Sequence, residues 1–96
     1  MYGTIGRMRL KPGAGERMKA LMAEYEGTTV PGFKGQVVYR SDRDPNEYWL
    51  AVVFESREAY VANAGSPEQH RRYLQYRELL EADPEWHDGE VAFSSM

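Results

Sequence analysis

The chain has 96 residues, of which 42% are hydrophobic and 28% are charged, and its formal net charge is -3 at pH 7. This size and composition predict one globular domain over residues 1–96, and the acidic balance argues against nucleic-acid binding, which usually requires a basic excess. There is no cysteine and no apolar run of membrane-spanning length, so we expect a cytoplasmic protein without disulfide or thiolate chemistry and without a membrane partner.

The first predicted elements are a strand over 2–10 and a helix over about 15–26. Side chains alternate along a strand, so Gly6 and Met8 fall on one face. The helix carries apolar residues at i, i+3, i+4 and i+7, which is typical of an amphipathic helix packed on a core. Its methionines suit a gap-filling core or, alternatively, the flexible wall of a pocket. The apolar positions are Met18, Leu21, Met22 and Tyr25.

A predicted hairpin follows, with strands over 33–40 and 47–55 joined by a polar turn over 41–46. A strand with one side in solvent should alternate apolar and polar residues, but the second strand of this hairpin is apolar on both sides. We therefore expect helices of the same chain to cover one side and a second subunit to cover the other. The apolar residues are Tyr48, Leu50, Val52 and Phe54 on one side, and Trp49, Ala51 and Val53 on the other.

Two helices are predicted after the hairpin, over about 57–63 and 67–81. Ser56 and Ser66 stand where N-caps are expected. Pro follows Ser66 directly, and Gln69 lies three residues on, which is the spacing of a capping box in which the Gln69 side chain closes the return hydrogen bond with Ser66.

The last predicted strand spans about 86–94 and carries His87. Arg77 and Glu81 are spaced for an i,i+4 ion pair at the end of the preceding helix. The predicted order is therefore β-α-β-β-α-α-β, an α+β, ferredoxin-like arrangement with a four-stranded antiparallel sheet and helices on one face. Two such sheets packed face to face would form a dimeric α/β barrel.

Three short motifs occur in order along the chain: Pro-Gly-Phe over 31–33, aromatic-Glu-Ser-x-Glu-Ala-Tyr over 54–60 and Ser-Pro-x-x-His over 66–70. Together they resemble the antibiotic biosynthesis monooxygenase (ABM) family of the dimeric α/β-barrel superfamily, with Phe54 where that family usually has Trp. The resemblance implies a homodimer with a pocket between sheet and helices in each subunit. Family members include cofactor-independent oxygenases of phenolic polyketides, haem-degrading oxygenases and quorum-signal-degrading enzymes, so membership does not fix the reaction.

Comparison with two branches of that family narrows the expectation. Haem-degrading members use Asn, Trp and a haem-ligating His at positions that align with Gly6, Asn63 and Tyr73, so none of the three matches. Phenol-oxidising members place Asn and Tyr at the equivalents of Asn63 and Tyr73, but their nearby Trp is replaced here by Gly65 and Ser66. The resemblance thus implies an oxidoreductase, a monooxygenase of a small aromatic or polyketide-like substrate, with no cofactor. Two alternatives stay open: a non-catalytic small-ligand-binding or stress-linked protein, and a haem-binding or haem-degrading member.

The candidate site combines polar and apolar residues. A phenolate or enolate can pass an electron to oxygen directly, so the protein has to favour the anion and exclude water. Asn63 and Tyr73 are candidate donors to that anion, and His70 is a candidate general base because imidazole exchanges protons near neutral pH. The plainer interpretations are a helix cap for Asn63, a core residue for Tyr73 and a surface residue for His70. The pocket for a small hydrophobic or aromatic ligand is expected to be lined by Gly6, Met8, Met22, Phe54 and Tyr73.

The remaining polar residues suggest structural roles. No spacing typical of metal ligands, a phosphate-binding loop or a nucleophilic triad is present. Arg7 and Arg9 could meet an anionic substrate, but ion pairs with Glu47 or Glu90 at a rim or subunit interface are the simpler account. His87 could line the barrel interior or have a structural role, and the structural role is favoured.

Overall fold

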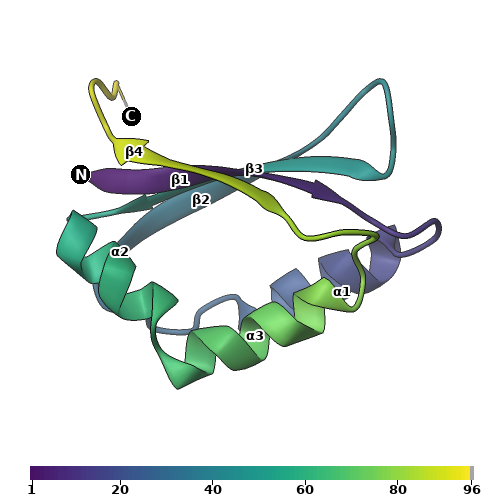
Figure 1. The fold of residues 1–96 in the computed structure, drawn as a ribbon, viewed down its shortest axis with the longest axis horizontal. Helices are drawn as coiled ribbons and strands as arrows, with labels where there is room; N and C mark the ends of the chain where they lie inside the picture. The colour runs from purple at the N-terminus through teal and green to yellow at the C-terminus, as the bar shows by residue number, and fades with distance from the viewer. Residues whose placement is uncertain (96) are drawn as a thin grey trace.

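The computed structural model describes residues 1–95 and contains four strands and three helices. Figure 1 shows two layers, with the sheet above and the helices below; α2 lies under the end of the sheet that carries the N-terminus. Among the described residues, none of the helices is both long and apolar enough to span a membrane. In chain order the elements are β1 (Tyr2–Arg9), α1 (Gly15–Tyr25), β2 (Phe33–Arg40), β3 (Glu47–Phe54), α2 (Arg57–Ala64), α3 (Pro67–Arg77) and β4 (Glu85–Glu90).

The sheet has the order β2-β3-β1-β4, and every neighbouring pair is antiparallel. The predicted ferredoxin-like α+β arrangement is therefore confirmed. The central strand β1 sets the register of both neighbours: Gly6 lies opposite Leu50 of β3 and Trp86 of β4, while Thr4 lies opposite Asp88 of β4. Because side chains alternate, all of these residues belong to the face that the helices cover.

The two predicted N-caps are present, but the capping box is incomplete. Ser56 Oγ accepts a hydrogen bond from the backbone N–H of Ala59, and Ser66 Oγ accepts one from that of Gln69, both at 3.1 Å. The expected return bond between Gln69 and Ser66 is not formed. The Gln69 amide oxygen accepts from Arg72 instead, and the Ser66 N–H donates to a backbone carbonyl of α2. This second bond ties the start of α3 to the end of α2.

Helix α3 ends at Arg77, earlier than the expected 81, because the following residues turn toward the sheet. Leu80 forms an isolated β-bridge with Leu10, and the Lys11 N–H donates to the Leu79 carbonyl at 2.8 Å. The residues after Arg77 are therefore not helical, and two of them, Leu79 and Leu80, are part of the core. Strand β4 is also shorter than expected and ends at Glu90.

The early end of α3 changes its ion pairs. Arg77 does not meet Glu81 but contacts Asp83, with 2.8 Å between Nε and Oδ1. Glu81 forms an ion pair with Arg9 of β1 instead, with 3.4 Å between Oε2 and Nε. The predicted i,i+4 pair was therefore wrong, because the chain between its two residues is not helical.

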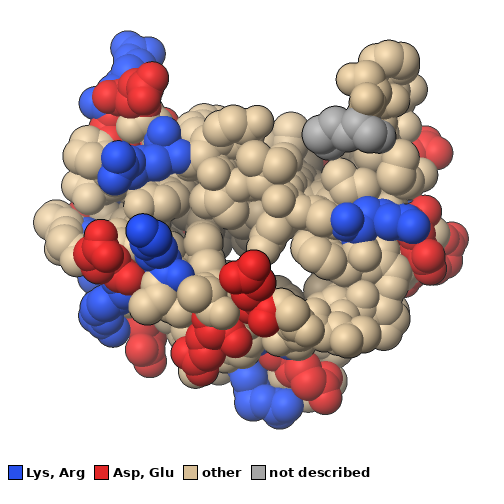
Figure 2. All heavy atoms as spheres, turned by 180° about the vertical axis from the view of Figure 1, so that it is seen from behind, with Lys and Arg blue, Asp and Glu red and all other residues tan. Residues whose placement is uncertain are grey.

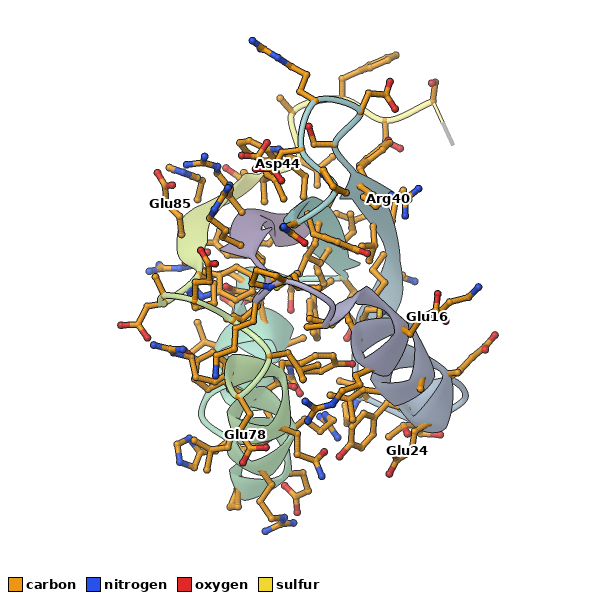
Figure 3. All side chains as sticks on the ribbon, turned by 90° about the vertical axis from the view of Figure 1, so that its right-hand side faces the viewer. Glu16, Glu24, Arg40, Asp44, Glu78 and Glu85 are labelled. Carbon is orange, nitrogen blue, oxygen red and sulfur yellow. The ribbon has the colours of Figure 1, made fainter. Side chains whose placement is uncertain are left out.

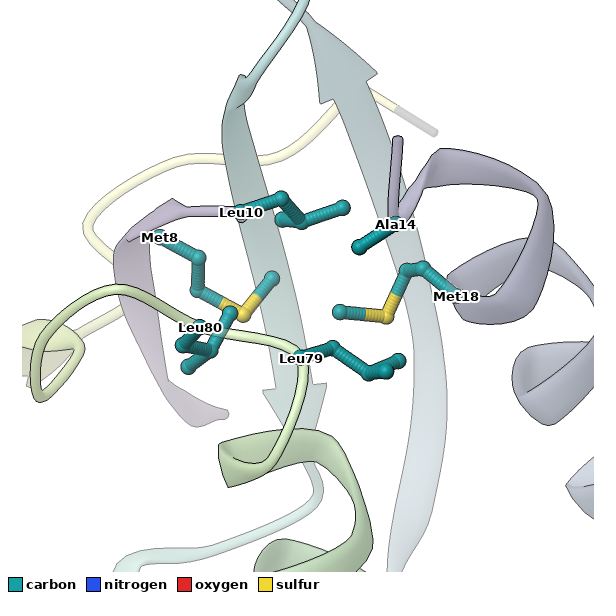
Figure 4. Close-up of a cluster of buried hydrophobic side chains, with 6 residues drawn as sticks. All are labelled: Met8, Leu10, Ala14, Met18, Leu79 and Leu80. Carbon is teal, nitrogen blue, oxygen red and sulfur yellow. The ribbon is translucent and has the colours of Figure 1, made fainter. Parts of the chain in front are cut away.

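The closed core lies at one end of the layers. It joins the end of β1, the start of α1 and the segment after α3, with Met18 fully buried at 0% exposure. Figure 4 shows these side chains pointing toward one another. The members are Met8, Leu10, Ala14, Met18, Leu79 and Leu80.

The other face of the sheet has no cover within the described chain. We call this surface the bare face; it carries exposed apolar side chains beside smaller half-buried ones, which fits the expectation that β3 is apolar on both sides. His87 lies opposite Ile5 on this face, 3.4 Å from Glu85, so it does not line the helix-facing side. The large apolar residues and their exposed fractions are Ile5 (51%), Val37 (44%), Tyr39 (61%) and Trp49 (37%).

Candidate functional site

A cavity of about 720 Å³ lies between the helix-facing side of the sheet and the helical layer. Ligand pockets for small molecules typically have about 300–1,000 Å³, so this volume suits a small organic ligand. Figure 2 shows an opening that leads inward between the two layers. The cavity exists because the core fills only one end of the space between the layers.

Most of the expected pocket residues lie in the wall of this cavity. Met8 and Phe54 are buried parts of it, and Met22 contributes from α1. Phe54 is fixed by edge-on ring contacts with Phe33 at 5.7 Å and Tyr60 at 5.6 Å between centroids. Such contacts hold an apolar wall in one shape.

Gly6 was expected to line the pocket, but the structure does not place it in the cavity wall. A Cβ atom at Gly6 would lie 2.5 Å from Cζ3 of Trp86, whose indole covers the glycine from the opposite strand. Trp86 itself is part of the cavity wall, whereas Gly6 is not. The space that the missing side chain leaves is therefore filled by an aromatic ring of β4.

The three candidate polar residues all line the cavity. Asn63 and Tyr73 are half-buried on α2 and α3, and His70 is exposed on the first turns of α3. Within residues 1–95 no hydrogen bond joins these side chains to one another or to another group, so their polar atoms are available to a ligand. The Asn63 side chain is not a helix cap; its backbone carbonyl accepts from Gly65 and Ser66.

A second polar group in the wall was missed from the sequence. Tyr60 of α2 donates a hydrogen bond from its hydroxyl to Oδ1 of Asp88 at 2.9 Å, and both residues line the cavity. Thr4 lies opposite Asp88 in the sheet, is only 7% exposed, and its Oγ1 has no hydrogen-bond partner among the described residues. Burial raises the pKa of the Tyr60 phenol, the bond to Asp88 adds to this rise, and the nearby Thr4 hydroxyl opposes it. Alternation along β1, which places Thr4 with Met8, was the signal that could have found Thr4.

A third polar group lies where α1 and α3 meet. The Tyr25 hydroxyl donates to Oε1 of Gln75, and the Arg72 guanidinium lies 5.8 Å from the centroid of the Tyr25 ring. Gln69 Oε1 accepts from Arg72 Nη2 at 3.1 Å, and Arg72 has no carboxylate partner in the described part of the chain. Burial raises the pKa of the nearby Tyr76 phenol, and Tyr25 adds to the rise while Arg72 opposes it.

Charged side chains otherwise keep to the outside of the two layers. Arg7 contacts Glu47 at 2.8 Å, as expected for a rim pair, and Arg9 contacts Asp44 at 2.6 Å. Over residues 1–95 no group of three or more His, Cys, Asp or Glu side chains could hold a metal ion. Figure 3 shows labelled charged residues at the surface of the helices and of the sheet edges: Glu16, Glu24, Glu78, Arg40, Asp44 and Glu85.

Comparison with solved structures shows the same fold in several proteins. SnoaB, a cofactor-independent oxygenase from Streptomyces nogalater, superposes with a TM-score of 0.83 at 17% identity over 98% of this chain and 95% of that one. Rv0793 from Mycobacterium tuberculosis gives 0.80 at 22% identity over 99% and 98%. A candidate antibiotic biosynthesis monooxygenase from Chloroflexus aurantiacus gives 0.73 at 26% identity over 97% and 96%.

Sequence comparison gives the family directly. No curated protein matches this chain significantly. The family model described as "Antibiotic biosynthesis monooxygenase" matches residues 1–75, which include every element from β1 to most of α3. The chain therefore belongs to the antibiotic biosynthesis monooxygenase family.

Proposed function

We propose that this protein is a cofactor-independent monooxygenase acting on a small aromatic or polyketide-like substrate. The observation that carries the proposal is a cavity of about 720 Å³ whose mostly apolar wall contains two hydrogen-bond donors without partners, Asn63 and Tyr73. Apolar walls with a few convergent polar groups are typical of small-molecule sites. The family and the likeness to SnoaB support the same reaction class.

In this proposal the substrate supplies the electrons. Loss of a proton gives a phenolate or enolate, which reduces O₂. On a hydroxyanthrone, one oxygen atom then replaces the two hydrogens of the ring CH₂ group as a new carbonyl, and the other leaves as water, so that this carbon provides all the electrons that O₂ accepts. Asn63 and Tyr73 donate hydrogen bonds to the anion, and His70 takes its proton at the mouth of the cavity. Met8, Met22 and Phe54 bind the ring system and keep water out.

The proposal includes a homodimer formed through the bare face. Four large apolar side chains there are between 37% and 61% exposed, which leaves one whole side of the sheet without cover in a single chain. A second copy offers the same surface, so a two-fold axis would pair apolar area with apolar area. With no cysteine to require an oxidising compartment, we place this dimer in the cytoplasm.

A ligand-binding role without catalysis is the second candidate. It is favoured by one observation: His70 has no orienting partner among residues 1–95, whereas a general base is usually held in place by a hydrogen bond. Oxygen uptake in the presence of hydroxyanthrones, quinols and catechols distinguishes the two candidates. Ultraviolet–visible titration with haem tests the third alternative, a haem-binding or haem-degrading member of the family. A shift of the Soret band would favour that alternative over the other two.

Tyr73→Phe tests the proposed mechanism because it removes one donor and keeps the ring. If Tyr73 acts as an oxyanion-hole donor does, losing it should slow turnover of a true substrate about a hundredfold or more, with thermal stability close to wild type. Tyr48→Phe is the matched control, since Tyr48 packs against the closed core and is not part of the cavity wall or of the bare face. Wild-type oxygen uptake by the Tyr73→Phe protein would remove Tyr73 from the mechanism.

A further inference from the structure

Three residues from three elements meet at one place in the cavity wall. Thr4 of β1 and Asp88 of β4 are directly opposite in the sheet and face the helices. Tyr60 of α2 reaches Asp88 with its hydroxyl at 2.9 Å. Its ring is held by contacts with Tyr2 at 5.4 Å and Phe54 at 5.6 Å between centroids, so its position is determined by packing.

The hydrogen-bonding capacity of this group is only partly used. The Thr4 hydroxyl is buried, lines the cavity and makes no hydrogen bond of standard geometry among the described residues, although it lies close enough to the Tyr60 hydroxyl to lower the pKa of that phenol. Buried polar groups are nearly always paired in folded proteins, because an unpaired one costs free energy. Asp88 is exposed at the edge of the cavity, accepts from Tyr60 through Oδ1 alone and meets no cationic side chain in residues 1–95, so its other oxygen remains free to accept.

We propose that Thr4, Tyr60 and Asp88 form a subsite that binds a hydroxyl group of the substrate. The hydroxyl would donate a hydrogen bond to the Asp88 carboxylate and accept a hydrogen bond from Thr4 Oγ1. A hydroxyl, which donates and accepts at the same time, satisfies both partners at once. A methyl ether or a ketone oxygen in the same place faces the carboxylate without a proton to share, and a carboxylate is repelled by it.

Tyr60 acts as a positioning residue in this subsite. Its hydroxyl donates to Oδ1 of Asp88, which lies opposite Thr4 in the sheet, and so restricts the orientation of the carboxylate. The phenol remains protonated as this donor, because burial and the neighbouring carboxylate both disfavour the phenolate. Tyr60 also precedes Asn63 by three residues on α2, which places the two side chains on the same helix face. The subsite therefore adjoins the proposed donor Asn63.

The inference rests on the proposed function only in taking the substrate to be a ligand of this cavity, so its test measures binding and not turnover. Hydroxylated bicyclic and tricyclic aromatics, beginning with 1,8-dihydroxynaphthalene, are each compared with the corresponding mono-O-methyl ether by calorimetry. We expect the hydroxyl compound to bind wild type about 10- to 100-fold more tightly than its ether, as for a hydrogen bond to a charged group.

The variants separate the subsite from a structural role. Thr4→Val keeps the shape and removes the hydroxyl, so the preference for the hydroxyl compound should decrease by about tenfold while Thr4→Ser retains it. Asp88→Asn and Tyr60→Phe should also weaken the preference. Thr29→Val, at an exposed threonine outside the cavity wall, is the matched control and should leave the preference unchanged.

Thermal unfolding without ligand gives an independent readout. Because Thr4→Val removes an unpaired buried hydroxyl, it should unfold at the same or a higher temperature than wild type. A lower unfolding temperature would mean that Thr4 already has a structural partner, such as a water molecule, and would overturn the subsite. The absence of any preference between hydroxyl compound and ether in wild type, including no binding of either, would overturn it as well. If the preference is present but no compound promotes oxygen uptake, the subsite stands and the proposed monooxygenase reaction fails.

Discussion

Val53→Lys is the substitution that tests the bare face most directly. Val53 lies in β3 between Gly3 of β1 and Gly35 of β2, so neither neighbouring strand has a side chain beside it. A partner sheet can approach closely at this point. A lysine there would place its charge in the middle of the proposed interface, where a buried, unpaired charge is strongly unfavourable.

The free energy that the bare face could contribute to dimerisation follows from the exposed fractions of its side chains. Fully burying a large apolar side chain contributes about 1.5–3 kcal/mol. The four large side chains of the bare face are 37% to 61% exposed, so covering the rest of each contributes on the order of 1 kcal/mol. Two protomers together would gain on the order of 8 kcal/mol from these residues. Two-fold symmetry would place one lysine from each protomer in the interface, and the desolvation penalty of several kcal/mol per buried ion would cancel much of that gain.

Sedimentation velocity at micromolar concentration measures the result. We expect wild type to sediment as a dimer and Val53→Lys as a monomer or an unfolded chain. Val61→Lys is the matched control, because Val61 is an exposed apolar residue on α2, away from the bare face. A wild-type protein that sediments as a single 11.1 kDa species would end the dimer proposal. A Val53→Lys protein that stays dimeric with unchanged unfolding temperature would show that Val53 lies outside the interface.

Two further predictions follow from the packing and the ion pairs. Gly6→Ala forces Trp86 to move, so it should lower stability by about 1–3 kcal/mol and shift tryptophan fluorescence. Gly89→Ala in β4, the strand that carries Trp86, should do neither, because no atom lies within 4 Å of an added Cβ there. The hydrogen bond from Arg7, with a smaller contribution from Trp49, holds the pKa of Glu47 below its usual 4.5. Because this pKa is lowered in the folded state, ionised Glu47 stabilises the fold above pH 4.5, and this stabilisation is lost as the pH falls. The difference in unfolding temperature between wild type and Glu47→Gln should therefore shrink between about pH 7 and about pH 3. A difference independent of pH would contradict this.

Local patterns in the sequence predicted what depends on neighbouring residues. The apolar stripe of α1, the caps Ser56 and Ser66 and the doubly apolar β3 are all present in the structure. Each of these is determined by residues within a few positions of one another. The fold followed because the order of the elements leaves few ways to pair the strands.

Features that depend on distant residues could not be predicted in the same way. The early end of α3 results from a bridge between Leu10 and Leu80, which are far apart in the chain. Trp86 covers Gly6 because of the register of β4, and no local pattern fixes that register. Met8 and Phe54, which the sequence pattern placed on the side of the sheet that faces the helices, line the cavity, whereas the meeting of Thr4 with Asp88 needed the assembled sheet.

The position of the core at one end of the molecule divides the helical layer into parts of unequal local stability. Helix α1 is anchored by the fully buried Met18, whereas α2 and α3 contain no buried residue. Regions with few buried contacts open at lower free energy than the core, so their backbone amides exchange hydrogen sooner. Helix α2, which carries Tyr60 and Asn63, is therefore expected to be among the first to open. A ligand that bridges these residues to the sheet would supply the contacts that this helix lacks, and would slow exchange there more than at α1.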